Sequence, residues 1–115
     1  MTILVVDDEP AVRSLVEAIL KGAGHSVSLA SNGLEGVSLY RSSPTRFDLV
    51  LTDLGMPVMD GHQLVKLIRE TNASARIICM SGYTDLPLPA NVDFLQKPFA
   101  PSDLRACVDN VLCRP

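Results

Sequence analysis

Short apolar runs of strand length alternate with amphipathic helical patterns along the chain. The runs are rich in Val, Ile and Leu or alternate polar with apolar residues, and they cover residues 3–6, 26–30, 48–52, 76–80 and 92–95. In most of the stretches between them, apolar residues recur every three or four positions, which places them on one face of a helix. These helical patterns cover residues 10–20, 34–40, 60–68 and 101–112. Such alternation predicts an α/β fold, a doubly wound parallel sheet of five strands with helices on both faces.

The residues that follow the strands carry the polar groups most relevant to function. The two most apolar runs, residues 3–6 and 49–52, should be central, because central parallel strands are buried on both faces. In a doubly wound sheet, ligands bind at the carboxyl ends of the strands, near the switch in strand order. The residues at these ends, which we expect to meet at one edge, are Asp7, Asp8, Asp53, Ser81 and Lys97.

Three carboxylates at one edge indicate a cation site. Like charges at close range raise a pKa or demand a counter-charge, and Mg²⁺ prefers hard oxygen ligands and often retains waters and a phosphate in its shell. Asp53 is then placed to act as a carboxylate nucleophile that forms an aspartyl phosphate. Lys97 can supply positive charge to phosphoryl oxygens and Ser81 a hydroxyl donor. We expect Lys97 to be exposed, so that its loss would remove charge and leave the packing intact.

Length, charge and composition exclude several classes of protein. The 115 residues are enough for one domain, residues 1–115, and too few for two. With a net charge of −3 and no run of Lys or Arg, direct nucleic-acid binding is not expected. The apolar runs are too short to span a membrane, so this segment should make no membrane contact. The three cysteines match no metal motif, and reduced thiols predict a cytoplasmic protein.

Four sequence fragments resemble the receiver domain of two-component response regulators. They stand in the family's order, each at the end of a predicted strand, and they are Val5-Val6-Asp7-Asp8-Glu9-Pro10, Asp53-Leu54-Gly55-Met56-Pro57-Val58-Met59-Asp60-Gly61, Ser81-Gly82-Tyr83 and Phe94-Leu95-Gln96-Lys97-Pro98-Phe99. The last two look most like receivers of hybrid sensor histidine kinases. The resemblance implies a flavodoxin-like sheet of order 2-1-3-4-5. It also implies a phosphorelay function, in which the chain accepts a phosphoryl group and signals by changing conformation.

The resemblance also implies a role for each site residue. Asp53 is the expected phosphoacceptor. The expected Mg²⁺ ligands are Asp7, Asp8, Asp53 and the backbone carbonyl of Gly55, with Asp8 the more direct of the acid pair. Lys97 precedes an expected cis peptide bond to Pro98, Ser81 and Phe94 are the expected switch residues, and Gly55 and Tyr83 should tune hydrolysis of the phosphorylated form. The expected partner is a histidine kinase or a histidine phosphotransfer domain, and the resemblance also allows a homodimer.

The chain departs from the family between Ser81 and Phe94. Only twelve residues separate the two, where most receivers have a loop and a full helix. Pro87 and Pro89 both oppose a helix interior, and each restricts the residue before it to extended geometry. The fourth helix of the family should therefore be shortened or missing.

Three other functions fit parts of the pattern. A receiver that is no longer phosphorylated would share the fold, but all five expected site residues are present. A Mg²⁺-dependent phosphatase with an aspartate nucleophile typically needs a second acid nearby, and Gly55 stands two residues after Asp53. A flavodoxin-type binder would need a phosphate-binding loop where Asp7 and Asp8 stand. We therefore expect that the chain is not an enzyme, apart from promoting its own phosphoryl transfer and slow dephosphorylation.

Overall fold

The computed structural model describes residues 1–43, 46–56, 58–82 and 87–114, which form five strands and four helices. The strands are β1 (Thr2–Val6), β2 (Ser26–Ala30), β3 (Leu49–Asp53), β4 (Ile77–Ser81) and β5 (Asp93–Gln96). The helices are α1 (Pro10–Gly22), α2 (Gly33–Ser42), α3 (Gly61–Thr71) and α4 (Pro101–Leu112). The predicted elements are thus confirmed, with boundaries that differ by a few residues.

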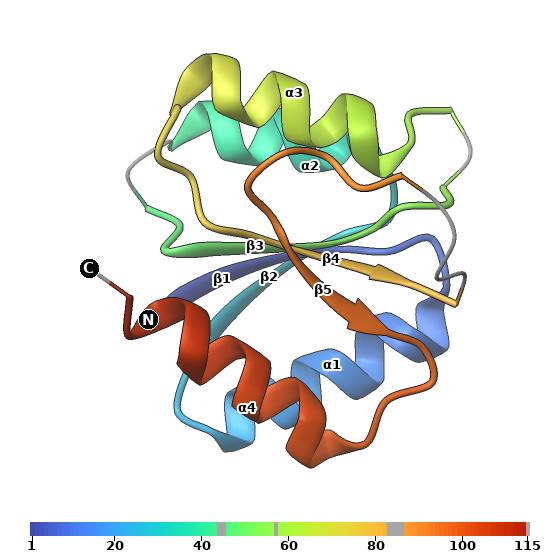
Figure 1. Cartoon of the computed structure of the whole chain (residues 1–115), viewed down its shortest axis with the longest axis vertical. Helices are drawn as coiled ribbons and strands as arrows, with labels where there is room; N and C mark the ends of the chain where they lie inside the picture. Colours follow the sequence, from blue (N-terminus) through green and yellow to red (C-terminus); the bar gives the residue numbers. More distant parts are fainter. Residues whose placement is uncertain (44–45, 57, 83–86, 115) are drawn as a thin grey trace.

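The strands form one parallel sheet in the order β2-β1-β3-β4-β5. Helices α1 and α4 cover one face of the sheet, and α2 and α3 cover the other (Figure 1). This arrangement confirms the doubly wound fold and the strand order that the sequence led us to expect. The order reverses between β1 and β3, so the carboxyl ends of these two strands mark the switch point.

Alternate residues of the central strands belong to two separate hydrophobic cores, one on each face of the sheet. On β1, Ile3 and Val5 pack with α1 and α4, whereas Leu4 and Val6 pack with α2 and α3. Successive side chains of a strand point to opposite faces of the sheet, which explains why an uninterrupted apolar run suits this position. All five residues of β3 are buried, so the polar side chain at its end is held on a rigid support.

The start of α3 is fixed by a reciprocal cap. The Gln63 N–H donates to Asp60 Oδ1 at 2.9 Å, and the Asp60 N–H donates to Gln63 Oε1 at 3.3 Å. These bonds satisfy backbone donors that the first turn of a helix would otherwise leave without partners. The Gly61 N–H also donates to the Leu54 carbonyl at 3.1 Å. The first turn of α3 is therefore joined to the chain just after β3.

The connection from β4 to β5 contains no helical residue among those that the structure describes, residues 82 and 87–92. The described part is held against α3 by two side chains. His62 Nε2 lies 2.5 Å from the Pro87 carbonyl oxygen, and the Arg69 guanidinium donates to the carbonyls of Ala90 and Asn91. The expectation of a shortened or missing helix is confirmed, and side chains of α3 hold the segment that replaces it.

No helix in the described parts of the chain is long and apolar enough to cross a membrane.

Candidate functional site

Asp7 and Asp53 lie side by side at the carboxyl ends of β1 and β3. Val6 pairs with Thr52 in the parallel ladder, so the next residue of each strand occupies the same edge. Asp7 is fully buried and Asp53 is 7% exposed. The sequence placed Asp53 and Ser81 just after their strands, whereas each is the last residue of its strand.

Four carboxylates converge at this edge. Asp7, Asp8, Glu9 and Asp53 each place one carboxylate oxygen within 4.8 Å of the others. Asp8 and Glu9 are less buried than Asp7 and Asp53. The predicted convergence of Asp7, Asp8 and Asp53 is observed, and Glu9 is an addition that the sequence did not single out.

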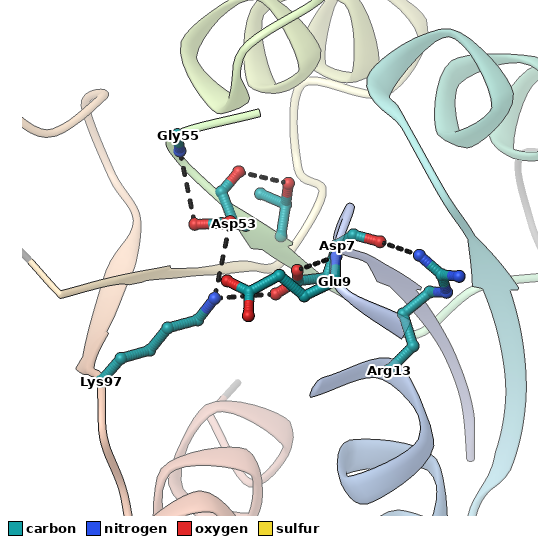
Figure 2. A network of polar contacts seen from close by, with 7 residues as sticks. Asp7, Glu9, Arg13, Asp53, Gly55 and Lys97 are labelled. Atoms are coloured by element: carbon teal, nitrogen blue, oxygen red, sulfur yellow. Dashed lines mark hydrogen bonds and ion pairs between the residues drawn. The ribbon is translucent and has the colours of Figure 1, made fainter. Parts of the chain in front are cut away.

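Lys97 supplies the positive charge of the cluster. Its Nζ lies 2.9 Å from Asp7 Oδ2 and 3.5 Å from Asp53 Oδ2, reaching them from the loop after β5 (Figure 2). The side chain is only 17% exposed, so the expectation of an exposed Lys97 is wrong. Because Lys97 pairs with the fully buried Asp7, its loss would also leave a buried charge without its counter-ion.

Burial and neighbouring charges shift the pKa values of the central pair. Burial raises the pKa of the Asp53 carboxyl; the negative charges of Asp7 and Asp8 act in the same direction, and together they outweigh the opposing effects of Lys97 and the Gly55 N–H. For Lys97, burial opposes the charged form. The hydrogen bond to Asp7 and the charges of Asp53 and Asp7 outweigh burial, so the pKa of Lys97 lies above its ordinary value.

This donor set fits a hard divalent cation. Four carboxylates face one ammonium group, which leaves an excess of negative charge at the edge of the sheet. Carboxylate oxygens are the ligands that Mg²⁺ prefers, together with waters and phosphate oxygens. The two less buried acids leave the cluster accessible from solvent. The geometry can therefore hold a metal ion next to Asp53.

Gly55 and Ser81, two other predicted site residues, both lie near Asp53. The Gly55 N–H donates to Asp53 Oδ1 at 3.3 Å. Among the residues that the structure describes, and apart from its chain neighbours, a methyl group at Gly55 would meet no atom within 4 Å, so Gly55 borders open space. Ser81 is buried at the end of β4, one residue after Met80, which pairs with Asp53. The functional roles of these residues stay predictions.

Two further expectations concern β5 and its neighbours. Phe94 is half-buried on β5 and pairs with Cys79 of β4, and its switching role stays a prediction. The Lys97–Pro98 peptide bond is cis, as the resemblance implied. Tyr83, the other predicted hydrolysis-tuning residue, lies outside the described residues.

Arg13 is another residue that the sequence did not single out. Its Nη1 donates to the Asp7 backbone carbonyl at 2.6 Å (Figure 2). Arg13 stands four residues after Glu9, one helical turn from the cluster, and that spacing was the only available signal.

A family model and similar proteins of known type point to the same family. Residues 3–109 match the response regulator receiver domain. The chain is 34% identical over 117 residues to the sensor kinase CckA of Brucella abortus, a match that covers 96% of this chain and 12% of that protein. It is also 34% identical over 114 residues to the two-component response regulator ARR22 of Arabidopsis thaliana, covering 99% of this chain and 76% of that protein.

Solved structures agree with the sequence comparison. The receiver domain of the hybrid histidine kinase CckA superposes with a TM-score of 0.88 at 33% identity, covering 97% of this chain and 99% of that chain. The chemotaxis protein CheY4 of Vibrio cholerae superposes with a TM-score of 0.87 at 29% identity, covering 96% and 97%. The chain spans only a small part of the sensor kinase that it matches. From its fold, its acidic edge and these matches together, the chain belongs to the family of response regulator receiver domains.

Proposed function

We propose that this chain accepts a phosphoryl group on Asp53 with the help of Mg²⁺ and passes the signal on by a change of conformation. The observation that carries the proposal is the position of Asp53. Its carboxylate lies inside the four-acid cluster, and Oδ2 is 3.5 Å from the Lys97 ammonium. A nucleophile between a cation site and a fixed positive charge suits phosphoryl transfer, in which catalysis is mainly positioning and charge stabilisation.

The chemistry balances without any further reagent. A carboxylate oxygen of Asp53 forms a bond to phosphorus, the bond from phosphorus to a donor histidine nitrogen breaks, and the freed imidazole takes up a proton from solvent. Lys97 would bind a phosphoryl oxygen in the product, and the hydroxyl of Ser81 would donate a second hydrogen bond. Mg²⁺, when bound, would neutralise charge on the phosphoryl oxygens. Asp7, Asp8, Asp53 and the Gly55 carbonyl would hold it.

The physiological phosphodonor is proposed to be a histidine kinase or a histidine phosphotransfer domain. The names of two relatives, a sensor kinase and a two-component response regulator, support this class of partner. We place the reaction in the cytoplasm, where free thiols such as those of Cys79, Cys107 and Cys113 stay reduced. The chain itself would promote transfer to its own aspartate and would not turn over a separate substrate.

Phosphorylation by a small donor provides the test. The purified chain is incubated with acetyl phosphate and Mg²⁺, and its intact mass is measured before and after acid or hydroxylamine treatment. We expect one added phosphoryl group that is chemically labile, as an acyl phosphate is. The group should be absent in Asp53→Asn and when EDTA replaces Mg²⁺.

Asp109→Asn provides the matched control, because it removes an exposed aspartate on α4, away from the carboxyl edge of the sheet. This variant should be phosphorylated as the wild type is. Undiminished modification of Asp53→Asn, or modification that does not need Mg²⁺, would contradict the proposal.

A further inference from the structure

Arg13 makes hydrogen bonds to backbone carbonyls on both sides of Asp8, one through its side chain and one through its backbone. Its guanidinium donates to the carbonyl of Asp7 at 2.6 Å, and its backbone N–H donates to the carbonyl of Glu9 at 3.0 Å. The side chain is half-buried in the first turns of α1 and points back toward the end of β1 (Figure 2). Asp8 therefore lies between two backbone groups that one residue restrains.

Asp7 is restrained at each of its polar groups. Its N–H donates to the Ala30 carbonyl at 3.2 Å, and its Oδ1 accepts from the Glu9 N–H at 2.9 Å. Its Oδ2 accepts from Lys97, and its carbonyl accepts from Arg13. Three of these four bonds fix the side chain or the strand, whereas the Arg13 bond fixes the peptide unit that leads into Asp8.

The orientation of that peptide unit matters for the metal site. The Asp7 carbonyl and the Asp8 N–H share one rigid plane, so a rotation of the carbonyl would swing the start of Asp8 with it. The Asp8 carboxylate is less buried than that of Asp7, and side-chain packing alone therefore restrains it less. Its direction depends on the backbone to which it is attached.

We propose that Arg13 is a positioning residue of the acidic site, which keeps the Asp8 carboxylate directed into the cluster by holding the Asp7–Asp8 peptide. Its effect on Mg²⁺ rests on the proposed function of the cluster. Groups that orient metal ligands through hydrogen bonds commonly change metal affinity by about 10- to 100-fold when removed. Arg13 would act on Asp8 in this way without contacting the ion.

The sign of the change in Mg²⁺ affinity when Arg13 is removed distinguishes a positioning role from an effect of its charge. A guanidinium is charged at all relevant pH values, and its repulsion of a divalent cation should weaken Mg²⁺ binding. If charge were its main influence, removing Arg13 would tighten Mg²⁺ binding. If positioning dominates, removing it weakens binding. The two mechanisms predict opposite signs.

The experiment compares Mg²⁺ affinity in four proteins by isothermal titration calorimetry. Arg13→Met removes both the charge and the donor, and we expect its Kd for Mg²⁺ to rise about 10-fold. Arg13→Lys retains the charge and one donor group and should recover part of the affinity. The control is Arg76→Met. Arg76 also donates to backbone carbonyls, those of Leu112 and Arg114, but it stands just before β4 at the opposite edge of the sheet. The control should bind Mg²⁺ with a Kd within about 2-fold of the wild type.

Amide hydrogen exchange in the absence of Mg²⁺ gives a second, independent readout. The amides of Asp8 and Glu9 should exchange faster in Arg13→Met than in the wild type, and no faster in Arg76→Met. Unchanged exchange at these two amides, or unchanged or tighter Mg²⁺ binding by Arg13→Met, would overturn the positioning role. If Arg13→Met does not fold, Arg13→Lys takes its place in both comparisons, with smaller shifts in the same directions. If the wild type binds no Mg²⁺, the proposed function fails, and the exchange of Asp8 and Glu9 alone decides the role of Arg13.

Discussion

Gly61 is the residue at which one added methyl group should disturb both the fold and the end of β3, where Asp53 stands. It is the first residue of α3 and packs directly against the end of β3. A Cβ atom built at this position would lie 2.6 Å from the Asp53 carbonyl oxygen and 2.8 Å from Leu54 Cα. Both are backbone atoms, which cannot rotate away as a flexible side chain can. Gly61→Ala must therefore move α3, the end of β3, or both.

The expected cost follows from two opposing effects. Replacing Gly by Ala in a helix ordinarily stabilises a protein by about 0.5–1 kcal/mol, since the unfolded chain loses freedom. Overpacking a well-filled site costs about 1–3 kcal/mol, and contact with backbone at 2.6 Å places Gly61 at the upper end of that range. The net loss should be about 2 kcal/mol, which corresponds to a fall in Tm of about 8 °C for a domain of this size.

Urea denaturation of Gly61→Ala, the wild type and Gly22→Ala measures this loss. Gly22 is the last residue of α1, and outside its own helix turn a methyl group there would meet no atom of the described residues within 4 Å. Gly22→Ala should be at least as stable as the wild type, which separates a general Gly-to-Ala effect from the clash at Gly61. The rate of Asp53 phosphorylation, measured without urea, where all three proteins are folded, should also be lower in Gly61→Ala than in the wild type. The reason is that the clash displaces the Asp53 backbone. A Gly61→Ala variant with wild-type stability and wild-type rate would refute the close packing of α3 on β3.

Two further predictions concern charge burial and backbone strain. Burial raises the pKa of Asp53 in the folded state above its value in the unfolded state. Between these two pKa values the folded chain binds more protons than the unfolded chain. The free energy of unfolding should therefore fall as the pH rises from the unfolded pKa to the folded pKa. Asp53→Asn should remove this pH dependence and raise the urea midpoint at pH 7; a lower midpoint would contradict it. Val58 has a φ of 71° and is 81% exposed. The left-handed backbone region costs a β-branched residue about 1–2 kcal/mol, whereas Asn adopts it more readily. Val58→Asn should therefore raise the free energy of unfolding by about 1 kcal/mol. A loss of stability in the same urea assay would show that Val58 makes compensating contacts.

The fold could be predicted in detail because each element carries its own local signal. The apolar runs and the helical spacing depend on neighbouring residues only, and parallel strands all end at the same edge of their sheet. Asp7 and Asp53 could therefore be placed together without any knowledge of their distance. The proline pair at positions 87 and 89 likewise acts on the local backbone, which made the loss of a helix predictable.

The pairings inside the site could not be predicted in this way. Lys97 and Asp7 are 90 residues apart, and whether their side chains meet depends on strand register and on how far each residue is buried. The sequence suggested an exposed Lys97, but the side chain lies across the sheet edge against a fully buried carboxylate. The contacts of Arg13 with a backbone carbonyl and of Arg69 with the β4–β5 connection were hidden for a similar reason.

By itself, the amino-acid sequence determined the order of strands and helices along the chain and the meeting of Asp7, Asp8, Asp53 and Lys97 at one edge of the sheet. These features depend on local periodicity and on the common direction of parallel strands. Only the tertiary structure decided which carboxylate Lys97 approaches most closely, that Glu9 joins the cluster, and that α3 holds the segment that stands in place of a helix. These outcomes depend on distances between residues far apart in the chain, and such distances exist only once the two cores have packed on either side of the sheet.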